Sequence, residues 1–140
     1  MLQTVRELMT PDPITLSTYD TVSDAARVMR EYNVGSILVT DRSDRLCGIV
    51  TDRDLVVRAI ALGRNPERTP LQDVYSEAIA ELHPDDSVDN AIRLMAKKGV
   101  RRVPVVDGNH AVGVLSLGDL AVARDPQSAL AGISASPANR

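Results

Sequence analysis

Residues 20–29 read Asp20-Thr-Val-Ser-Asp-Ala-Ala-Arg-Val-Met29, and a closely related run, Asp86-Ser-Val-Asp-Asn-Ala-Ile-Arg-Leu-Met95, follows 66 positions later. The correspondence continues at the same offset from residues 34–41 to residues 100–107. After a turn that is one residue shorter, Gly48-Ile-Val-Thr-Asp-Arg-Asp-Leu55 aligns with Gly113-Val-Leu-Ser-Leu-Gly-Asp-Leu120. A chain that repeats itself at a fixed period predicts two copies of one structural unit.

Each copy carries the same local signals in the same order. The decamers above place apolar residues at i, i+3, i+4 and i+7, which indicates an amphipathic helix beginning after Thr21 in one copy and after Ser87 in the other. Two runs rich in β-branched residues follow in each copy and predict a β-hairpin. These runs are residues 36–40 with 47–50, and residues 103–106 with 112–115.

Further elements flank each hairpin. A closing helix is predicted from Asp52 to about Leu62, ending near Gly63, and its counterpart from Leu117 to about Arg124. Short leading strands are predicted at residues 14–16 and 79–81, and a short helix near Thr4 and near Thr69 leads into each repeat.

The predicted fold class is therefore α/β (α+β), with two β-α-β-β-α repeats related by a pseudo-twofold axis and packed through their sheets. One copy of about 50 to 60 residues buries too little apolar surface to be stable by itself. We expect residues 4–66 to form repeat 1 with its leading helix and linker, residues 67–125 to form repeat 2, and residues 126–140 to be a flexible tail.

Composition narrows the class of protein. The 140 residues are 44% apolar, yet they include no Phe, no Trp and three Tyr, so the core must be aliphatic. Binders of single-stranded nucleic acid use aromatic side chains to stack bases, and all nucleic-acid binders need a basic field. A net charge of -3 with almost no aromatic residues predicts no nucleic-acid partner.

Cys47 is the only cysteine, which excludes an internal disulfide and favours a reducing, cytoplasmic setting. The N-terminal residues lack the pattern of a secretion signal, and no run of about 18 apolar residues is present. We therefore expect a cytoplasmic protein with no membrane partner.

Two motifs stand out for ligand chemistry, Thr51-x-x-Asp54 and Ser116-x-x-Asp119, at equivalent places in the two copies. A carboxylate can accept hydrogen bonds from both cis hydroxyls of a ribose, and arginine can contact phosphate. The same motifs are also those of helix caps, a role that needs no ligand and that Thr21 and Ser87 already illustrate. Both roles can coexist.

Together with Met9-Thr-Pro11 and Val100-Arg-Arg-Val-Pro-Val-Val-Asp107, these repeated motifs make the sequence resemble a tandem pair of CBS domains, often called a Bateman module. The resemblance covers roughly residues 4–125 and is greatest to small bacterial CBS-pair proteins of the hypoxic-response type. It implies a homodimer and two ligand sites in a cleft between the repeats. The expected ligand is AMP, ADP or ATP, and S-adenosylmethionine and NADH are left open as alternatives.

The resemblance also implies the role of individual residues. The aspartate of each motif would bind ribose hydroxyls, the hydroxyl residue would approach phosphate, and apolar residues around Ile14 and Ile37, and around Ile79 and Val103, would enclose the adenine. The implied contacts in repeat 1 are Ile14, Ser36, Ile37, Gly48, Ile49, Thr51, Arg53 and Asp54. Those in repeat 2 are Ile79, Arg102, Val103, Pro104, Gly113, Val114, Ser116 and Asp119.

The two implied sites differ in their charges, so we expect different affinities. Repeat 1 has Gly35-Ser36 where repeat 2 has Arg101-Arg102, and Asp52-Arg53 where repeat 2 has Leu117-Gly118.

Other function classes find less support. The sequence contains no nucleophile elbow, Walker motif or His/Cys constellation, so we expect no enzyme activity, no catalytic cofactor and no metal site. The predicted function is a regulatory module that senses adenine nucleotides in energy or stress responses and acts in trans on an unidentified protein target. The alternative is a dimerisation scaffold that binds no ligand.

Overall fold

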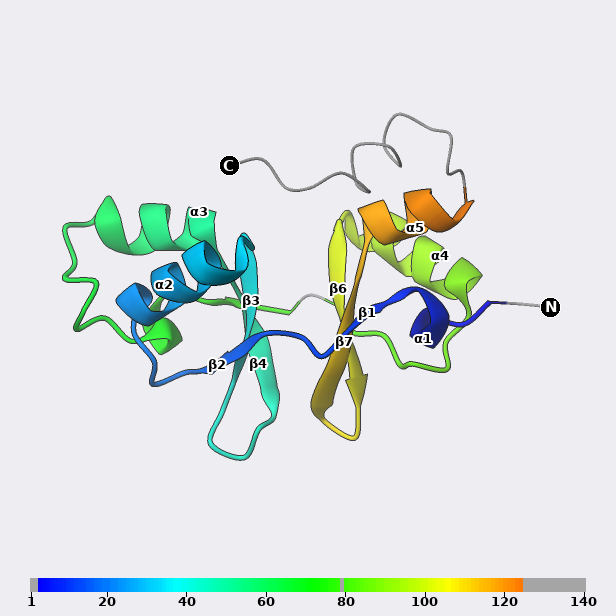
Figure 1. Ribbon diagram of the computed structural model, residues 1–140, viewed down its shortest axis with the longest axis horizontal. Helices are drawn as coiled ribbons and strands as arrows, with labels where there is room; N and C mark the ends of the chain where they lie inside the picture. Colours follow the sequence, from blue (N-terminus) through cyan, green and yellow to red (C-terminus); the bar gives the residue numbers. More distant parts are fainter. Residues whose placement is uncertain (1–2, 79, 125–140) are drawn as a thin grey trace. The chain divides into compact units, whose positions relative to one another are not determined.

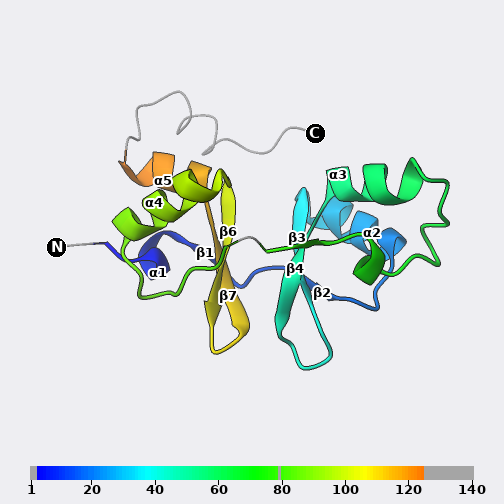
Figure 2. The ribbon, with the colours of Figure 1, turned by 180° about the vertical axis from the view of Figure 1, so that it is seen from behind.

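The computed structural model describes residues 3–78 and 80–124, which form two compact units (Figures 1 and 2). The first unit is residues 14–78, and the second combines residues 3–13 with residues 80–124. The predicted tail at 126–140 lies outside the described residues, as does Ile79. The packing of the two repeats through their sheets stays a prediction.

The first unit is a four-stranded sheet covered on one side by helices (Figure 1). The strand order is β2-β3-β4-β5, in which β2 runs parallel to β3 and the other pairs are antiparallel. Its strands and helices are β2 (Thr15–Ser17), α2 (Val22–Tyr32), β3 (Ser36–Thr40), β4 (Leu46–Thr51), α3 (Asp52–Leu55) and β5 (Ser76–Glu77). A π-helix over Val56–Ile60 continues α3, and a 3-10 turn at Leu71–Asp73 precedes β5.

The second unit has a similar arrangement of strands and helices, but its sheet has three strands instead of four. Its antiparallel strands follow the order β1-β7-β6, and its helices again lie on one side of them (Figure 2). Its elements are α1 (Val5–Leu8), β1 (Thr10–Pro11), α4 (Val88–Lys98), β6 (Arg102–Asp107), β7 (His110–Ser116) and α5 (Leu117–Arg124).

The leading segments are exchanged between the repeats. Strand β1, from the start of the chain, pairs with β7 of the second repeat, with Thr10 opposite Val114. Strand β5, which precedes the second repeat in sequence, pairs with β4 of the first, with Ser76 opposite Ile49. The spatial units therefore differ from the sequence division at 66/67, because backbone pairing joins each leading segment to the opposite hairpin.

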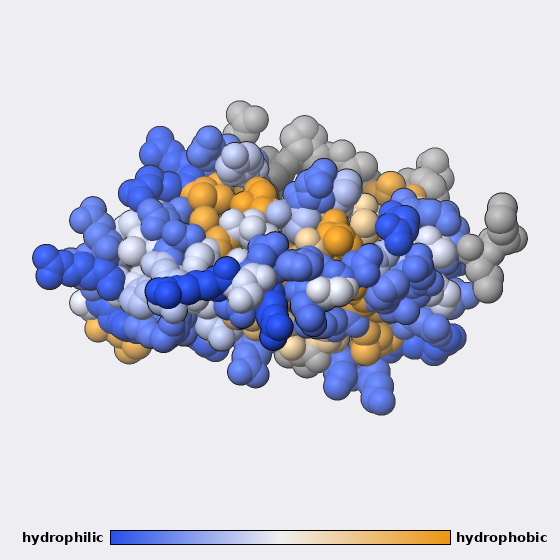
Figure 3. All heavy atoms as spheres, turned by 90° about the horizontal axis from the view of Figure 1, so that it is seen from below, coloured by the Kyte–Doolittle hydropathy of each residue, from blue (hydrophilic) through white to orange (hydrophobic). Residues whose placement is uncertain are grey.

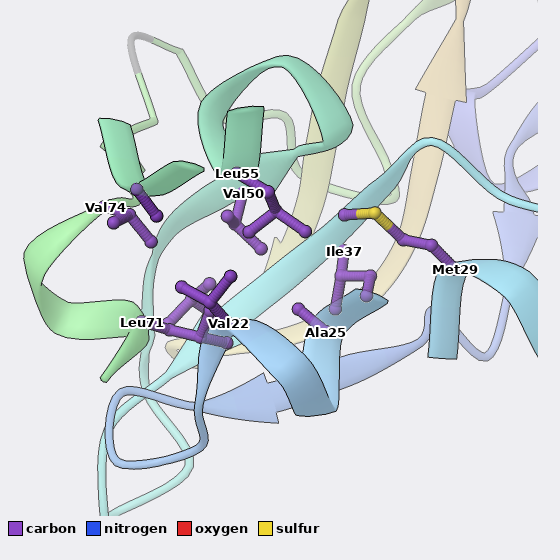
Figure 4. Close-up of a cluster of buried hydrophobic side chains, with 10 residues drawn as sticks. Val22, Ala25, Met29, Ile37, Val50, Leu55, Leu71 and Val74 are labelled. Atoms are coloured by element: carbon purple, nitrogen blue, oxygen red, sulfur yellow. The ribbon is translucent and has the colours of Figure 1, made fainter. Parts of the chain in front are cut away.

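The two cores confirm the internal repeat. In the first unit, α2 contributes Val22, Ala25 and Met29 to a buried aliphatic cluster (Figure 4). The second unit buries Val88, Ala91 and Met95 in the same way. The exchange of leading segments also affects the cores. Leu71 lies in the first core, and Val5, its equivalent 66 positions earlier, lies in the second.

The leading strand of the second repeat is shorter than predicted. In the first unit, the Leu38 N–H donates to the Ile14 carbonyl at 3.1 Å, just ahead of β2. The equivalent of Leu38 is Pro104, which has no N–H to donate. Pairing is instead limited to a parallel bridge between Leu82 and Val105, so the strand predicted at 79–81 does not form at Ala80 or Glu81.

The closing helix of the first repeat also departs from the prediction. Its α-helical part ends at Leu55, and hydrogen bonds such as Ala61 N–H to the Val56 carbonyl at 2.8 Å wind the next turn as a π-helix. The predicted end near Gly63 agrees with the left-handed φ of 71° at that residue.

Hydrophilic side chains cover most of the face drawn in Figure 3, and hydrophobic residues reach it in separate patches. None of the described helices has the length and apolar character needed to cross a lipid bilayer.

A side chain at Gly48 should destabilise the fold. A Cβ there would overlap the Ser76 carbonyl oxygen and lie 2.7 Å from the Tyr75 ring, so Gly48→Ala must push β5 away from β4. We expect the free energy of unfolding in urea to fall by about 1 to 3 kcal/mol. Gly35→Ala is the control, because its Cβ meets only the movable end of Asp52 at 3.2 Å. Equal losses in both variants would contradict the close approach.

Candidate functional site

Both repeated motifs form reciprocal hydrogen-bonded boxes at the start of a closing helix. In the first unit, the Thr51 N–H donates to Asp54 Oδ2 at 2.9 Å and the Asp54 N–H donates to Thr51 Oγ1 at 3.1 Å. In the second, the Ser116 N–H donates to Asp119 Oδ2 at 3.0 Å and the Asp119 N–H donates to Ser116 Oγ at 3.1 Å. The box uses one carboxylate oxygen in each case, which leaves Oδ1 outside it.

The antiparallel register brings a second residue to each motif. Ser36 lies directly opposite Thr51 across β3 and β4, and Arg102 lies opposite Ser116 across β6 and β7. Directly opposed residues of a sheet share one face and have Cβ atoms roughly 5 Å apart. The strand register therefore places Ser36 beside Thr51, and Arg102 beside Ser116.

The second unit holds a cavity of about 380 Å³ at this place. Three residues predicted from the resemblance line it: Arg102, Ser116 and Asp119. Its other lining residues are Arg101, Leu117, Gly118 and Val122. Arg101 belongs to the Arg101-Arg102 pair that distinguishes repeat 2 from repeat 1 in the sequence. The spacing of Val122, three residues after Asp119 on α5, is the signal that could have identified it.

Charged groups surround the equivalent motif of the first unit. Arg58 Nε lies 3.7 Å from Asp54 Oδ1, and a terminal nitrogen of Arg58 donates to the Tyr75 carbonyl at 3.2 Å. Arg53 is exposed on the first turn of α3, and its backbone N–H donates to Asp52 Oδ1 at 2.8 Å.

Several predicted contacts also have structural roles. Gly48 and Gly113 are buried, and a Cβ on Gly113 would lie 2.6 Å from Met9 Sδ, so both glycines make room for the exchanged strands. Ile37 and Val103 are 1% and 0% exposed within the two cores. Their side chains are enclosed in the cores, and the contact with an adenine that the resemblance implies at these positions stays a prediction.

Of the remaining predicted residues, Ile49 and Val114 lie two positions before Thr51 and Ser116 on β4 and β7. Ile49 is cross-strand partner to Leu38, and Val114 to Pro104, in register positions that alternate with the core residues of the same strands. Ile14 is partly buried and packs on the first core. Ile79 lies outside the described residues. Among residues 3–78 and 80–124, no three His, Cys, Asp or Glu side chains are grouped to hold a metal ion.

A similar box begins α2, away from these motifs. The Thr21 N–H donates to Asp24 Oδ2 at 2.9 Å, and this bond lowers the pKa of Asp24, with help from the Thr21 hydroxyl and Arg27 and against the effect of partial burial. At the start of α4, Asn90 stands in place of the aspartate, and Ser87 Oγ accepts from its N–H at 3.1 Å. Burial, together with Asp41, raises the pKa of the Cys47 thiol, which disfavours a reactive thiolate.

Comparison with known proteins gives a consistent result. The family model for the CBS domain matches residues 5–60 and again residues 71–125. CBS domain-containing protein YhcV of Bacillus subtilis is 40% identical over 121 residues, covering 86% of this chain and 85% of that protein. Hypoxic response protein 1 of Mycobacterium tuberculosis is 29% identical over 120 residues, covering 86% of this chain and 84% of that protein.

Solved structures agree. Hypoxic Response Protein I, determined with two coordinated zinc ions, matches with a TM-score of 0.77 and 29% identity, covering 85% of this chain and 97% of that one. A CBS domain pair determined in complex with methylthioadenosine and S-adenosyl-L-methionine matches with a TM-score of 0.76 and 23% identity, covering 91% of this chain and 100% of that one.

Asp24 and Asn90 occupy the third position of α2 and of α4. Exchanging the two residue types should move the pH dependence of the free energy of unfolding from α2 to α4. An aspartate whose pKa is lower in the folded state stabilises the fold at pH values above its unfolded pKa of about 4. This contribution to the free energy of unfolding is lost as the pH falls through the folded-state pKa. Asp24→Asn should therefore lower the free energy of unfolding by up to about 1 kcal/mol at pH 7, and by progressively less as the pH falls below about 4. Asn90→Asp should have the opposite effect over the same pH range. Urea unfolding between pH 2 and 7 measures both, and differences that do not vary with pH would contradict this account.

Proposed function

This chain belongs to the CBS domain family as a tandem pair of CBS domains, and on that premise we propose that it is a non-catalytic regulatory module that binds an adenine nucleotide. The observation that carries the proposal is the cavity of the second unit, which brings Ser116 and Asp119 together with Arg101 and Arg102. These are the groups that a ribose and a phosphate require.

The chemistry of the cavity supports this ligand class. The Asp119 carboxylate keeps Oδ1 outside the capping box, where it can accept from ribose hydroxyls. Guanidinium groups form charge-assisted hydrogen bonds with phosphate oxygens. A volume of about 380 Å³ falls within the usual range for small-molecule sites, roughly 300 to 1,000 Å³. The related CBS pair solved with methylthioadenosine and S-adenosyl-L-methionine supports the capacity of this fold to hold an adenosyl group.

Regulation would follow from differential affinity. A ligand that binds one arrangement of the chain better than another shifts the population toward it, and a partner protein can read that shift in trans. AMP, ADP and ATP all fit this proposal, as does a role in energy or stress sensing. The alternative is a ligand-independent dimerisation scaffold, which makes no demand on the two aspartates beyond helix capping.

Calorimetric titration with AMP and ATP tests the proposal. Nucleotide-free protein should bind, and the double variant Asp54→Ala, Asp119→Ala should bind at least about tenfold more weakly, because each aspartate supplies charged hydrogen bonds to ribose. Asp24→Ala is the matched control, since it removes an equivalent capping carboxylate at another helix start. If Asp24→Ala weakens binding equally, the aspartates act through stability alone. Absence of binding by the unmodified protein would favour the scaffold.

We also propose that the chain forms a homodimer through the exposed apolar side chains of the first closing helix and of the turn that follows it. Val56, Val57, Ile60 and Leu62 are 56%, 47%, 54% and 70% exposed. Such a cluster of large apolar residues is typical of an interaction surface.

Sedimentation velocity tests the dimer. Val57→Asp with Ile60→Asp should shift the protein to monomer, because burying unpaired carboxylates in an interface costs several kcal/mol, on the order of 2 to 7. Tyr19→Asp changes a residue that is 56% exposed elsewhere in the unit and should leave the dimer intact. A monomeric wild-type protein would overturn the proposal.

A further inference from the structure

We infer that the exposed apolar side chains of the first unit dock in an apolar groove on the second unit of another copy of this chain. These side chains, called the exposed cluster below, are those of Val56, Val57, Ile60 and Leu62. The contact makes the dimer head-to-tail and sets the partner subunit against a wall of the nucleotide cavity. The inference rests on the proposed homodimer and, for its effect on the ligand, on the proposed nucleotide binding.

The groove lies between α4 and α5, which run antiparallel. At one end, a terminal nitrogen of Arg124 lies 3.1 Å from Asp89 Oδ1, and at the other the Leu117 N–H donates to the Arg101 carbonyl at 2.8 Å. The groove has a volume of about 460 Å³. Its lining residues are mostly apolar: Ile92, Met95, Ala96, Gly99, Val100, Arg101, Leu117, Leu120, Ala121 and Arg124.

Two small residues help to open the groove. Ala96 on α4 and Ala121 on α5 occupy the positions that Arg30 and Val56 hold in the first repeat. Val56 is 56% exposed, so the first unit presents a side chain at a position where the second unit has space. The two closing helices thus offer a projection and a hollow of matching apolar character.

The exposed cluster is the occupant that the chain itself supplies. Within residues 3–78 and 80–124, nine large apolar side chains are exposed, and four of them form the cluster. Ile92 and Leu117, which border the groove, are two more, at 39% and 42% exposure. Docking the cluster in the groove therefore removes most of this exposed apolar surface from water, which is the main favourable contribution to association.

The size of a stable interface favours the same arrangement. Stable protein interfaces use about 20 to 30 residues on each side. The cluster supplies four residues, and the groove adds ten. A twofold dimer in which each subunit inserts its cluster into the other's groove uses both surfaces on both subunits. Pairing cluster with cluster and groove with groove would instead set projection on projection and hollow on hollow.

The groove and the nucleotide cavity share a wall. Arg101 and Leu117 line both of them. A partner subunit in the groove packs against these side chains, and side chains that are already ordered cost less to fix when a ligand binds. The dimer should therefore bind AMP more tightly than the monomer, and AMP should strengthen the dimer by the same factor.

Sedimentation velocity of Ala96→Arg tests the docking. Ala96 is exposed and lines the groove, so an arginine there fills the groove without entering the core. The dimer dissociation constant should rise at least about tenfold, because the guanidinium would have to be buried in an apolar contact. Ala123→Arg is the matched control, since Ala123 is exposed on α5 outside the groove lining, and it should leave the dimer intact. Urea unfolding should show both variants to be folded.

Mixing two variants tests the head-to-tail arrangement. The double variant Val57→Asp, Ile60→Asp changes only the cluster, and Ala96→Arg changes only the groove. A head-to-tail pair of the two variants keeps one intact contact, so the mixture should form heterodimers at concentrations at which each variant alone is monomeric. If cluster pairs with cluster and groove with groove, every contact in the mixture is damaged, and absence of heterodimers would overturn the arrangement.

Calorimetric titration with AMP tests the link to the cavity. Ala96→Arg should bind AMP about fivefold more weakly than the dimeric wild type, whereas Ala123→Arg should bind it equally well. Equal AMP affinities in monomeric Ala96→Arg and dimeric wild type would overturn the link. A dimeric Ala96→Arg would overturn the docking and leave the proposed homodimer standing. A wild type that dimerises in this way but binds no AMP would overturn the proposed nucleotide binding and leave the docking in place.

Discussion

Each folded unit depends on a strand that belongs, in sequence, to the other repeat. The contact that permits this is the close approach of β5 to Gly48 and of β1 to Gly113, where there is no space for a side chain. Without the exchanged segments, each core loses an apolar residue that is 0% exposed, Leu71 in one unit and Val5 in the other. Neither repeat is therefore a complete folding unit by itself, although their sequences are equivalent.

The reciprocal boxes at the closing helices cap these helices and hold their carboxylates in place. Thr51 and Asp54, like Ser116 and Asp119, satisfy backbone N–H groups that the first turn of a helix leaves without partners. The hydrogen bonds hold each carboxylate in one orientation, and only one of its oxygens is used. Under the proposed function, a side chain positioned by the fold in this way would receive a ligand at little additional entropic cost.

Duplication has kept the scaffold and changed its charges. Most core positions agree between the repeats, since a change of volume in a packed interior costs stability, although Ala59 is buried and its equivalent Arg124 is exposed. The residues around the two motifs tolerate change because they are at least partly exposed. Asp52 against Leu117 and Gly35 against Arg101 are differences that the fold accepts.

Much of the fold could be predicted from the sequence because its signals are local. The spacing of Val22, Ala25 and Met29 follows the 3.6-residue period of a helix, and it determined the buried face of α2 and, 66 residues on, of α4. The paired motifs identified the capping boxes, since the spacing of hydroxyl and carboxylate residues is a property of one helical turn. The effect of Pro104 on the leading strand was also local, and its missing N–H could have indicated the shorter pairing.

Other features depended on contacts between distant segments. The sequence alone placed the repeat boundary at 66/67, because it contains no mark that β1 and β5 add to the opposite hairpins. It suggested Ile37 and Val103 as ligand contacts, and only the packed sheets showed that these side chains face a core. The cavity is of the same kind, because it needs the cross-strand register that sets Arg102 opposite Ser116. The sequence by itself therefore determined the repeats, helices and caps, which arise within a few residues, whereas the tertiary structure decided which side chains meet, because that depends on long-range backbone pairing.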